Sequence, residues 1–148
     1  MDRDTDAAVR TLLDRAAIGD VILRYSRALD RRDWDEVAAC FTPDGYADYG
    51  VFKGNVKEVV ASIRQGLEVF DKTMHFMEPR IIELSGDKAR AETYALAYHR
   101  RADGGETKEL LVRLRYLDEL VRHGDGWLIQ RRTAEFVFGR EGEVVLPQ

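Results

Sequence analysis

The sequence predicts an α+β fold in which N-terminal helices pack on an antiparallel sheet. Two observations support this class. Apolar residues recur at helical spacing as far as about Phe70, and four long segments of strand-like composition follow. Long antiparallel strands twist and curl, so a sheet closed by helices should enclose a concavity. The chain has 148 residues and shows no linker or repeat, and it is expected to form one domain over residues 1–148.

Three helices are expected in the first half of the chain. The first contains one apolar stripe between Ile18 and Leu29. Asp33 can cap a second, short helix, with Glu36 as the third residue of a capping box, and Pro43 ends it. A third helix is expected over residues 55–70, where valine, isoleucine and leucine again fall on one side.

The remaining segments have the character of turns or strands. TPDG at 42–45 is typical of a turn, and YADYGVF at 46–52 is typical of a short strand. Further along, SGD, ADGGE and HGDG are typical of hairpin turns, and they separate four extended segments. These segments cover about residues 73–84, 88–102, 107–121 and 127–138.

Composition limits the classes of function. A net charge of −4 provides no basic surface for nucleic acid. No apolar run approaches the ~18 residues that a membrane span needs, so no membrane partner is expected. The acidic, polar N-terminus does not resemble a secretory signal, and a cytoplasmic protein is expected. The single cysteine, Cys40, cannot form an internal disulfide and is expected to be a buried apolar side chain.

The strand expected at 88–102 suggests where a pocket lies. One of its faces carries small side chains and ends in an imidazole: Ala89, Ala91, Thr93, Ala95, Ala97 and His99. Small inward-facing residues leave volume for a ligand, or they allow a helix to pack closely on the sheet. This strand alone supports both interpretations equally.

Histidines are the first candidates for proton transfer near neutral pH. His75 shares a strand face with Thr73 and Met77, and its segment is adjacent to the segment that holds His99. Each histidine alone could be a hydrogen-bonded core residue. Two of them on adjacent strands favour a common cavity, whereas His123 lies in a turn and is expected to be exposed.

Asp30 and the nearby tyrosines are less clearly placed. Asp30 lies about 140° around the helix from Tyr25, so helix geometry alone favours a solvated position at the helix end. Tyr49 can face inward only if Asp48 faces outward, or the reverse. Both tyrosines could donate a hydrogen bond to a ligand in the concavity.

Motifs for cofactors are missing from the sequence. It contains no phosphate-binding glycine loop, no dinucleotide fingerprint and no serine-centred elbow. Two histidines and one aspartate could in principle ligate a metal, but no compact spacing supports such a site. Neither a metal nor an organic cofactor is therefore expected.

Several of these residues together resemble the SnoaL-like branch of the nuclear-transport-factor-2-like superfamily. The resemblance rests on RYSRALDRRDWDEVAACFTPDG, DYG, MHF, YHRR and RYLDELVRHGDGWLI, and it runs from about Ala16 to Phe138. The superfamily includes scytalone dehydratase and the bacterial bile-acid 7α-dehydratase, and its fold is a cone, a strongly curved antiparallel sheet wrapped by helices, with a deep apolar pocket. It also includes isomerases, cyclases, epoxide hydrolases and non-catalytic binding subunits, so the fold alone does not define the function.

The resemblance implies roles for individual residues. Tyr25 and Asp30 match the Tyr-x₄-Asp of the bile-acid enzyme, whereas scytalone dehydratase has its catalytic aspartate where this chain has Arg27. Tyr49 matches a strand tyrosine of both enzymes, and His75 matches the first family histidine. The second histidine of scytalone dehydratase matches His99, where the bile-acid enzyme has an aspartate. A serine and an asparagine of scytalone dehydratase are absent, and their region holds Arg113, Arg115, Tyr116 and Asp118.

These matches imply a cofactor-independent lyase, and in particular a dehydratase for a small, apolar, cyclic carbonyl compound of polyketide, steroid or terpenoid type. His75 would be the base, oriented by Asp30, and His99 would assist the departing hydroxyl. Tyr25 and Tyr49 would donate to the carbonyl oxygen. The expected substrate contacts are Trp34, Phe52, Phe76, Ala97 and Tyr116. An isomerase or cyclase could use the same groups, and a non-catalytic ligand-binding or assembly module could use the same cone.

A homo-oligomer, either a dimer or a trimer, is also expected. One layer of helices cannot cover both faces of a curved sheet. The outward residues of the last strands are expected to be apolar and include Leu111, Leu117, Val121, Phe136 and Phe138. Exposed apolar surface usually marks an interface, and most oligomers have closed symmetry.

Overall fold

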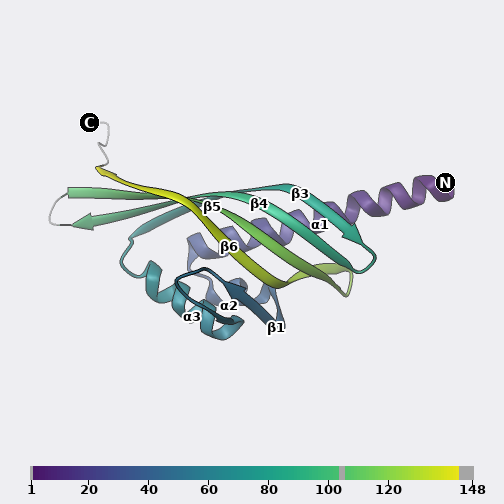
Figure 1. Cartoon of the computed structure of the whole chain (residues 1–148), viewed down its shortest axis with the longest axis horizontal. Coiled ribbons are helices and arrows are strands. Elements are labelled where there is room, and N and C mark those ends of the chain that lie inside the picture. The colour runs from purple at the N-terminus through teal and green to yellow at the C-terminus, as the bar shows by residue number, and fades with distance from the viewer. Residues whose placement is uncertain (1, 104–105, 144–148) are drawn as a thin grey trace.

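A computed structural model describes residues 2–103 and 106–143 of the chain. Helices come first and a strand meander follows, as predicted (Figure 1). The helices are α1 (Arg3–Arg31), α2 (Trp34–Ala39) and α3 (Val56–Leu67). The strands are β1 (Phe41–Asp48), β2 (Lys53–Asn55), β3 (Lys72–Ser85), β4 (Lys88–Asp103), β5 (Glu106–His123) and β6 (Gly126–Glu143). The predicted turn ADGGE has its centre, residues 104–105, outside the described residues.

The strands form one sheet in the order β2-β1-β6-β5-β4-β3. The pairings are antiparallel except for β1 with β6, which is parallel. The predicted class is confirmed, because helices pack along a curved, unclosed sheet (Figure 1), but the sheet is mixed rather than purely antiparallel. The prediction missed this because β1 comes from the helical half of the chain. No hairpin joins β1 to β6, so no turn determines its direction.

α1 begins much earlier than its apolar stripe predicts. Asp2 caps the helix, because its carboxylate accepts hydrogen bonds from the backbone N–H groups of Asp4 and Thr5 at 2.9 and 2.8 Å. The first turns of α1 extend past the sheet (Figure 1) and leave apolar side chains such as Leu12 exposed. The buried stripe starts at Ile18, as predicted.

α2 and α3 begin at side chains that act as caps. Asp33 accepts a hydrogen bond from the backbone N–H of Glu36 at 3.1 Å, so the predicted cap of α2 is confirmed. The predicted capping box is not formed, because the carboxylate of Glu36 pairs with Arg24 and the backbone N–H of Asp33 donates to Ala28. A reciprocal capping box opens α3, where the side chains of Asn55 and Glu58 each accept from the other residue's backbone N–H. α3 then ends at Leu67, before the predicted limit at residue 70.

The local prediction is wrong around residues 42–52. TPDG forms part of β1 rather than a turn. The pairing of β1 with β6 shifts register between Phe41 and Tyr46, and this irregularity accommodates Pro43, which has no N–H to donate. The predicted strand is also divided, because β1 ends before Tyr49 and β2 begins after it.

The small residues of β4 divide between the core and a cavity. Ala89 and Ala91 belong to the core cluster that includes Ile22 of α1, so there they allow close packing. Further along the strand, Ala97 and His99 line a cavity. Each of the two interpretations of this strand therefore holds for one part of it.

The outer face of the sheet exposes large apolar side chains, which are Met74, Phe76, Ile81, Leu96, Leu117 and Phe138. Phe136 does not belong to this set, because it lines the cavity on the other face. The register of β5 with β6 shifts between Arg113 and Leu114, so Phe136 and Phe138 point to opposite faces. The prediction that Phe136 is an outer residue is wrong for this reason.

Candidate active site

A cavity of about 370 Å³ lies between the helices and the inner face of the sheet. The lining residues with polar ring or hydroxyl groups are Tyr25, Tyr49, Ser62, His75, His99 and Tyr116. The rest of the wall is mainly apolar and includes Leu29, Ile63, Leu67, Phe70, Leu110, Val112, Leu114 and Phe136. Apolar cavities with a few convergent polar groups are the usual form of small-molecule sites.

His75 and Asp30 form a hydrogen-bonded pair at this wall. Nδ1 of His75 lies 2.7 Å from Oδ1 of Asp30, and the backbone N–H of His75 donates to Oδ2 at 3.0 Å. An ionised carboxylate only accepts hydrogen bonds, so the proton of the neutral imidazole is on Nδ1, and in that form Nε2 keeps its lone pair. The expected contact between Asp30 and His75 is therefore present, and it prepares Nε2 to accept a proton.

Asp30 lies behind His75 and is not part of the cavity wall. Partial burial raises the pKa of its carboxyl group, but hydrogen bonds and charge from His75, with a hydrogen bond from Thr73, hold that pKa below its ordinary value. The carboxylate is therefore ionised near neutral pH. The helical-angle argument assumed that Asp30 must face the cavity beside Tyr25, whereas Asp30 acts on the cavity only through the imidazole.

His99 lies beside His75 on the neighbouring strand. The ring centroids are 5.5 Å apart, with an angle of 85° between the planes. Nδ1 of His99 is 3.3 Å from the carbonyl oxygen of Leu110, and the ring of Phe70 packs at 4.8 Å. Burial lowers the pKa of His99 below its ordinary value, so the ring is neutral near pH 7. With its proton on Nδ1, the ring has an accepting Nε2.

The hydroxyl groups of Tyr25 and Tyr49 are 2.5 Å apart. Burial raises the pKa of both phenols, so both remain protonated. Either hydroxyl can donate in this pair, and the donor leaves the other hydroxyl with its own hydrogen. When Tyr25 donates, the hydrogen of the Tyr49 hydroxyl is available to a ligand.

A buried ion pair lies behind the tyrosines. The side chains of Arg132 and Asp118 are both 0% exposed and share two hydrogen bonds of 2.7 and 2.8 Å. The guanidinium lies 4.3 and 4.2 Å from the ring centroids of Tyr25 and Tyr116. The positive charge of Arg132 also opposes the rise in pKa that burial causes at Tyr49. A cation therefore acts on the hydroxyl pair without lying in the cavity wall.

Sequence analysis missed Arg132 because simple alternation places it on the wrong face. Trp127 and Ile129 are buried, so strict alternation would bury Arg131 instead. The register of β6 with β5 shifts here and leaves Gln130 as an extra residue, which turns Arg132 inward. The available signal was on the partner strand, where Asp118 lies two residues from the inward-facing Tyr116 and therefore shares its face.

The five predicted substrate contacts divide into two groups. Phe52, Ala97 and Tyr116 line the cavity. Phe76 does not, because it alternates with His75 along β3 and is 55% exposed on the outer face. Trp34, at the start of α2, borders a separate depression formed with α3. The predictions for Phe76 and Trp34 are wrong.

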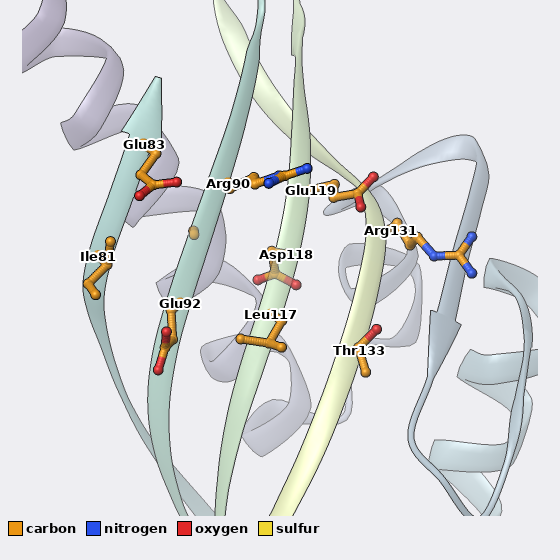
Figure 2. A pocket seen from close by; sticks show the side chains of 10 residues that line it. Ile81, Glu83, Arg90, Glu92, Leu117, Asp118, Glu119, Arg131 and Thr133 are labelled. Carbon is orange, nitrogen blue, oxygen red and sulfur yellow. The ribbon is translucent and has the colours of Figure 1, made fainter. Parts of the chain in front are cut away.

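A second concavity, on the outer face of the sheet, has a different chemistry (Figure 2). Its volume is about 400 Å³, and charged side chains of both signs border it: Glu83, Arg90, Glu92, Glu119 and Arg131. None of its lining residues is a histidine, a cysteine or a tyrosine. The imidazole and phenol groups that converge on one cavity are thus those of the inner cavity.

Other expectations concern single residues and partners. Cys40 is buried and His123 is exposed, as predicted. Burial raises the pKa of the Cys40 thiol. Within residues 2–103 and 106–143, no group of three or more His, Cys, Asp or Glu side chains is arranged to hold a metal ion. No helix in these two ranges is long and apolar enough to cross a membrane.

The fold and the cavity define a class, namely small α+β proteins in which helices and a curved sheet enclose an apolar pocket with acid–base side chains. The chain belongs to the SnoaL-like domain family, whose model matches residues 10–133. Uncharacterized protein Rv2910c of Mycobacterium tuberculosis is a relative with 30% identity over 130 residues, which cover 85% of this chain and 87% of the relative.

Solved structures share this fold at lower identity. A scytalone dehydratase-like protein from Novosphingobium aromaticivorans superposes with a TM-score of 0.81 at 22% identity, over 93% of each chain. The hexachlorocyclohexane dehydrochlorinase LinA-type3 from Novosphingobium barchaimii has a TM-score of 0.78 at 17% identity, over 95% of this chain and 99% of its own. At these identities the likeness establishes the fold.

Proposed function

We propose that the protein is a cofactor-independent lyase, a dehydratase that removes water from a small, apolar, cyclic carbonyl compound. One observation carries this proposal: a single cavity holds a histidine with an ionised carboxylate behind it and a phenol donor with a cation behind it. The names of two structural neighbours, a dehydratase and a dehydrochlorinase, both refer to eliminations and are consistent with this chemistry.

The first step is removal of a proton from the carbon beside the carbonyl. Nε2 of His75 accepts this proton, and the Asp30 carboxylate stabilises the resulting imidazolium through Nδ1. Charge develops on the carbonyl oxygen, which takes a hydrogen bond from the hydroxyl of Tyr49. In this proposal Tyr25 donates to that hydroxyl, which is one of the two directions that their contact allows, and the buried guanidinium of Arg132 stabilises the negative charge from behind the rings.

The second step is loss of the hydroxyl group at the next carbon. The C–O bond breaks, its electron pair leaves with the oxygen, and the proton held by His75 passes to the departing hydroxide to give water. His99 assists by holding the leaving group, because its neutral ring offers an accepting Nε2 to the hydroxyl hydrogen. The imidazole of His75 is then neutral again, and the cycle is complete without a cofactor.

The lining residues indicate a neutral substrate. Among the described residues that line the cavity there is no Asp, Glu, Lys or Arg. A charged substrate would lose its hydration without gaining a counterion, which is costly. A compact ring system with one carbonyl and one hydroxyl group matches a cavity of about 370 Å³. Polyketide-, steroid- and terpenoid-like compounds are the classes to test.

The experiment is a pair of assays on the purified protein. A panel of cyclic β-hydroxyketones is followed by the ultraviolet absorbance of the conjugated enone product. Matching ketones without the hydroxyl group are followed by NMR for exchange of the α-proton in D₂O. Enone formation, abolished in His75→Gln, supports a dehydratase.

The other outcomes separate the alternatives. Exchange or double-bond migration without water loss on any panel member would favour an isomerase. Binding with neither reaction would favour a ligand-binding module. Turnover is expected to persist after exhaustive chelation, with the metal content measured on the same sample. Loss of turnover that one specific metal restores would contradict the mechanism.

A further inference from the structure

Arg32 occupies an unusual backbone position directly after α1. Its φ is 60°, and among the described residues it is the one non-glycine residue with a positive φ. Helices commonly end at such a left-handed position, which glycine or asparagine usually fills. The backbone cap itself is made by the N–H group, which donates to the carbonyl oxygen of Leu29 at 3.1 Å. Ending the helix therefore does not explain an arginine.

The guanidinium of Arg32 joins three elements. Nη1 donates to the carbonyl oxygen of Leu29 at 3.1 Å and to the hydroxyl of Thr73 at 2.9 Å. Nη2 lies 3.4 and 3.3 Å from the carbonyl oxygens of Leu67 and Phe70. One side chain thus ties together the end of α1, the end of α3 with its following loop, and the start of β3.

One branch of this network leads to His75. The hydroxyl of Thr73 accepts from Arg32 and donates to Oδ1 of Asp30 at 3.1 Å. That same oxygen accepts from Nδ1 of His75. The guanidinium of Arg32 polarises the hydroxyl of Thr73, and this hydroxyl in turn holds the carboxylate of Asp30. Both hydrogen bonds are charge-assisted and are therefore stronger than bonds between neutral groups. The orientation of the carboxylate therefore depends on Thr73.

The other branch leads to His99. The carbonyl group of Phe70 is held by Arg32, and the ring of Phe70 packs against His99. Phe70 and Leu67 both line the cavity. The rim of the cavity and the second histidine are therefore fixed by the same guanidinium that holds Thr73.

We propose that Arg32 and Thr73 are positioning residues that set the geometry of both histidines, Thr73 through Asp30 and Arg32 through Thr73 and Phe70. This inference rests on the proposed function, in which His75 must present an unprotonated Nε2 to the substrate. The charged and titratable groups around Asp30 are His75 and His99 from the sheet and Arg32 from the end of α1.

Thr73→Val and Thr73→Ser form a matched pair for the first branch. Valine keeps the shape but removes the hydroxyl, and serine keeps the hydroxyl. Thr73→Val is expected to lower kcat about tenfold, the effect of one lost hydrogen bond, while KM changes by less than about twofold. The pKa of Asp30, followed by ¹³C NMR of its carboxyl carbon, should rise, because Asp30 loses a donor that lowers this pKa. Thr73→Ser should restore both.

Arg32→Gly tests the second branch. Glycine accepts the left-handed backbone, so the helix end is retained while the guanidinium is lost. A fall in kcat of about tenfold or more is expected, together with a rise in KM, because the rim at Phe70 loses its anchor. Thermal unfolding of each variant, compared with the parent, identifies any loss that comes from unfolding.

A readout without substrate separates this inference from the proposed function. In the ligand-free protein, ¹H–¹⁵N NMR should show a downfield Nδ1 proton on His75, and Thr73→Val should broaden or shift it. If the protein has no activity on the panel, this signal decides alone. An unchanged Nδ1 signal in Thr73→Val, or parental kcat in both Thr73→Val and Arg32→Gly, would overturn the proposal.

Discussion

Replacing Asp30 with asparagine is the sharpest test of the proposed base. Both carboxylate oxygens face donors, because Oδ1 accepts from the imidazole of His75 and from Thr73, and Oδ2 accepts from the backbone N–H of His75. An asparagine has one accepting oxygen and one NH₂ group. If the NH₂ faces Nδ1, the imidazole must move its proton to Nε2. The nitrogen that should accept the substrate proton is then blocked.

The expected loss follows from this change of tautomer. Proton transfer by a positioned side chain typically contributes ~10²–10⁴-fold, and Asp30→Asn should forfeit most of that contribution in kcat. If the amide turns the other way, its NH₂ opposes the backbone N–H of His75 and disturbs the strand, so neither orientation preserves the site. The rate is measured by enone formation, and α-proton exchange in the ketone lacking the hydroxyl reports on the base alone.

The control for this substitution is Asp35→Asn. Asp35 is exposed in the first turn of α2, so the same chemical change there should leave kcat within about twofold, as for most surface substitutions. His75→Gln should lower the rate at least as much as Asp30→Asn. An Asp30→Asn protein that is folded and within about tenfold of parental kcat would refute the role of the carboxylate.

Three further predictions concern stability and assembly. Asp118→Leu leaves the buried Arg132 without its counterion, so the free energy of unfolding, measured with urea, should fall by about 3–5 kcal/mol. Adding Arg132→Met should recover much of this loss, and a fall of less than about 1 kcal/mol for Asp118→Leu would contradict the prediction. Burial lowers the pKa of His99 below its ordinary 6.5, so below that pH the unfolded chain binds a proton that the folded protein resists. The free energy of unfolding should therefore decrease as pH falls through 6.5 towards the folded-state pKa, and His99→Gln, compared by urea unfolding, should lack this part of the slope. We also propose that the exposed apolar outer face of the sheet pairs with another copy of the chain. Light scattering at micromolar concentration should then give a dimer or trimer, and the double variant Phe76→Lys with Leu96→Lys should weaken this assembly. A monomeric parent protein would contradict the proposal.

Much of the fold could be predicted because its elements have clear local periodicity. The four long strands fall within a few residues of their predicted ranges, and the alternation on β4 identifies its buried face correctly. The parallel pairing of β1 with β6 could not be predicted, since strands distant in sequence are joined by tertiary packing rather than by a turn. The same holds for TPDG, whose turn composition is overridden by pairing within the sheet.

The candidate site was predictable where a residue lies directly on the cavity wall and less so behind it. Alternation and resemblance placed His75 at the wall, and the resemblance alone placed Tyr49 there. Geometry along one helix argued against a place for Asp30 in the site, because it took no account of the contact with His75, which lies 45 residues later in the chain. Arg132 was hidden by one extra residue in β6, which reverses the faces of everything beyond it.

The positions of Asp30 and Arg132 share a feature that also bears on the chemistry. Formal charge in this site lies one layer behind the wall, with Asp30 behind His75 and Arg132 behind the tyrosines. The cavity surface is thereby uncharged, which suits an apolar, neutral substrate. Each charge nevertheless lies in a partly or fully water-excluded position, where it acts more strongly than in water on the proton and the oxyanion of the proposed reaction. Such an arrangement fixes the donors and acceptors before the substrate enters, so the reaction needs little rearrangement of the protein. Such charges are set by tertiary contacts between distant segments, and that is why the sequence shows the wall of the site more clearly than the groups that activate it.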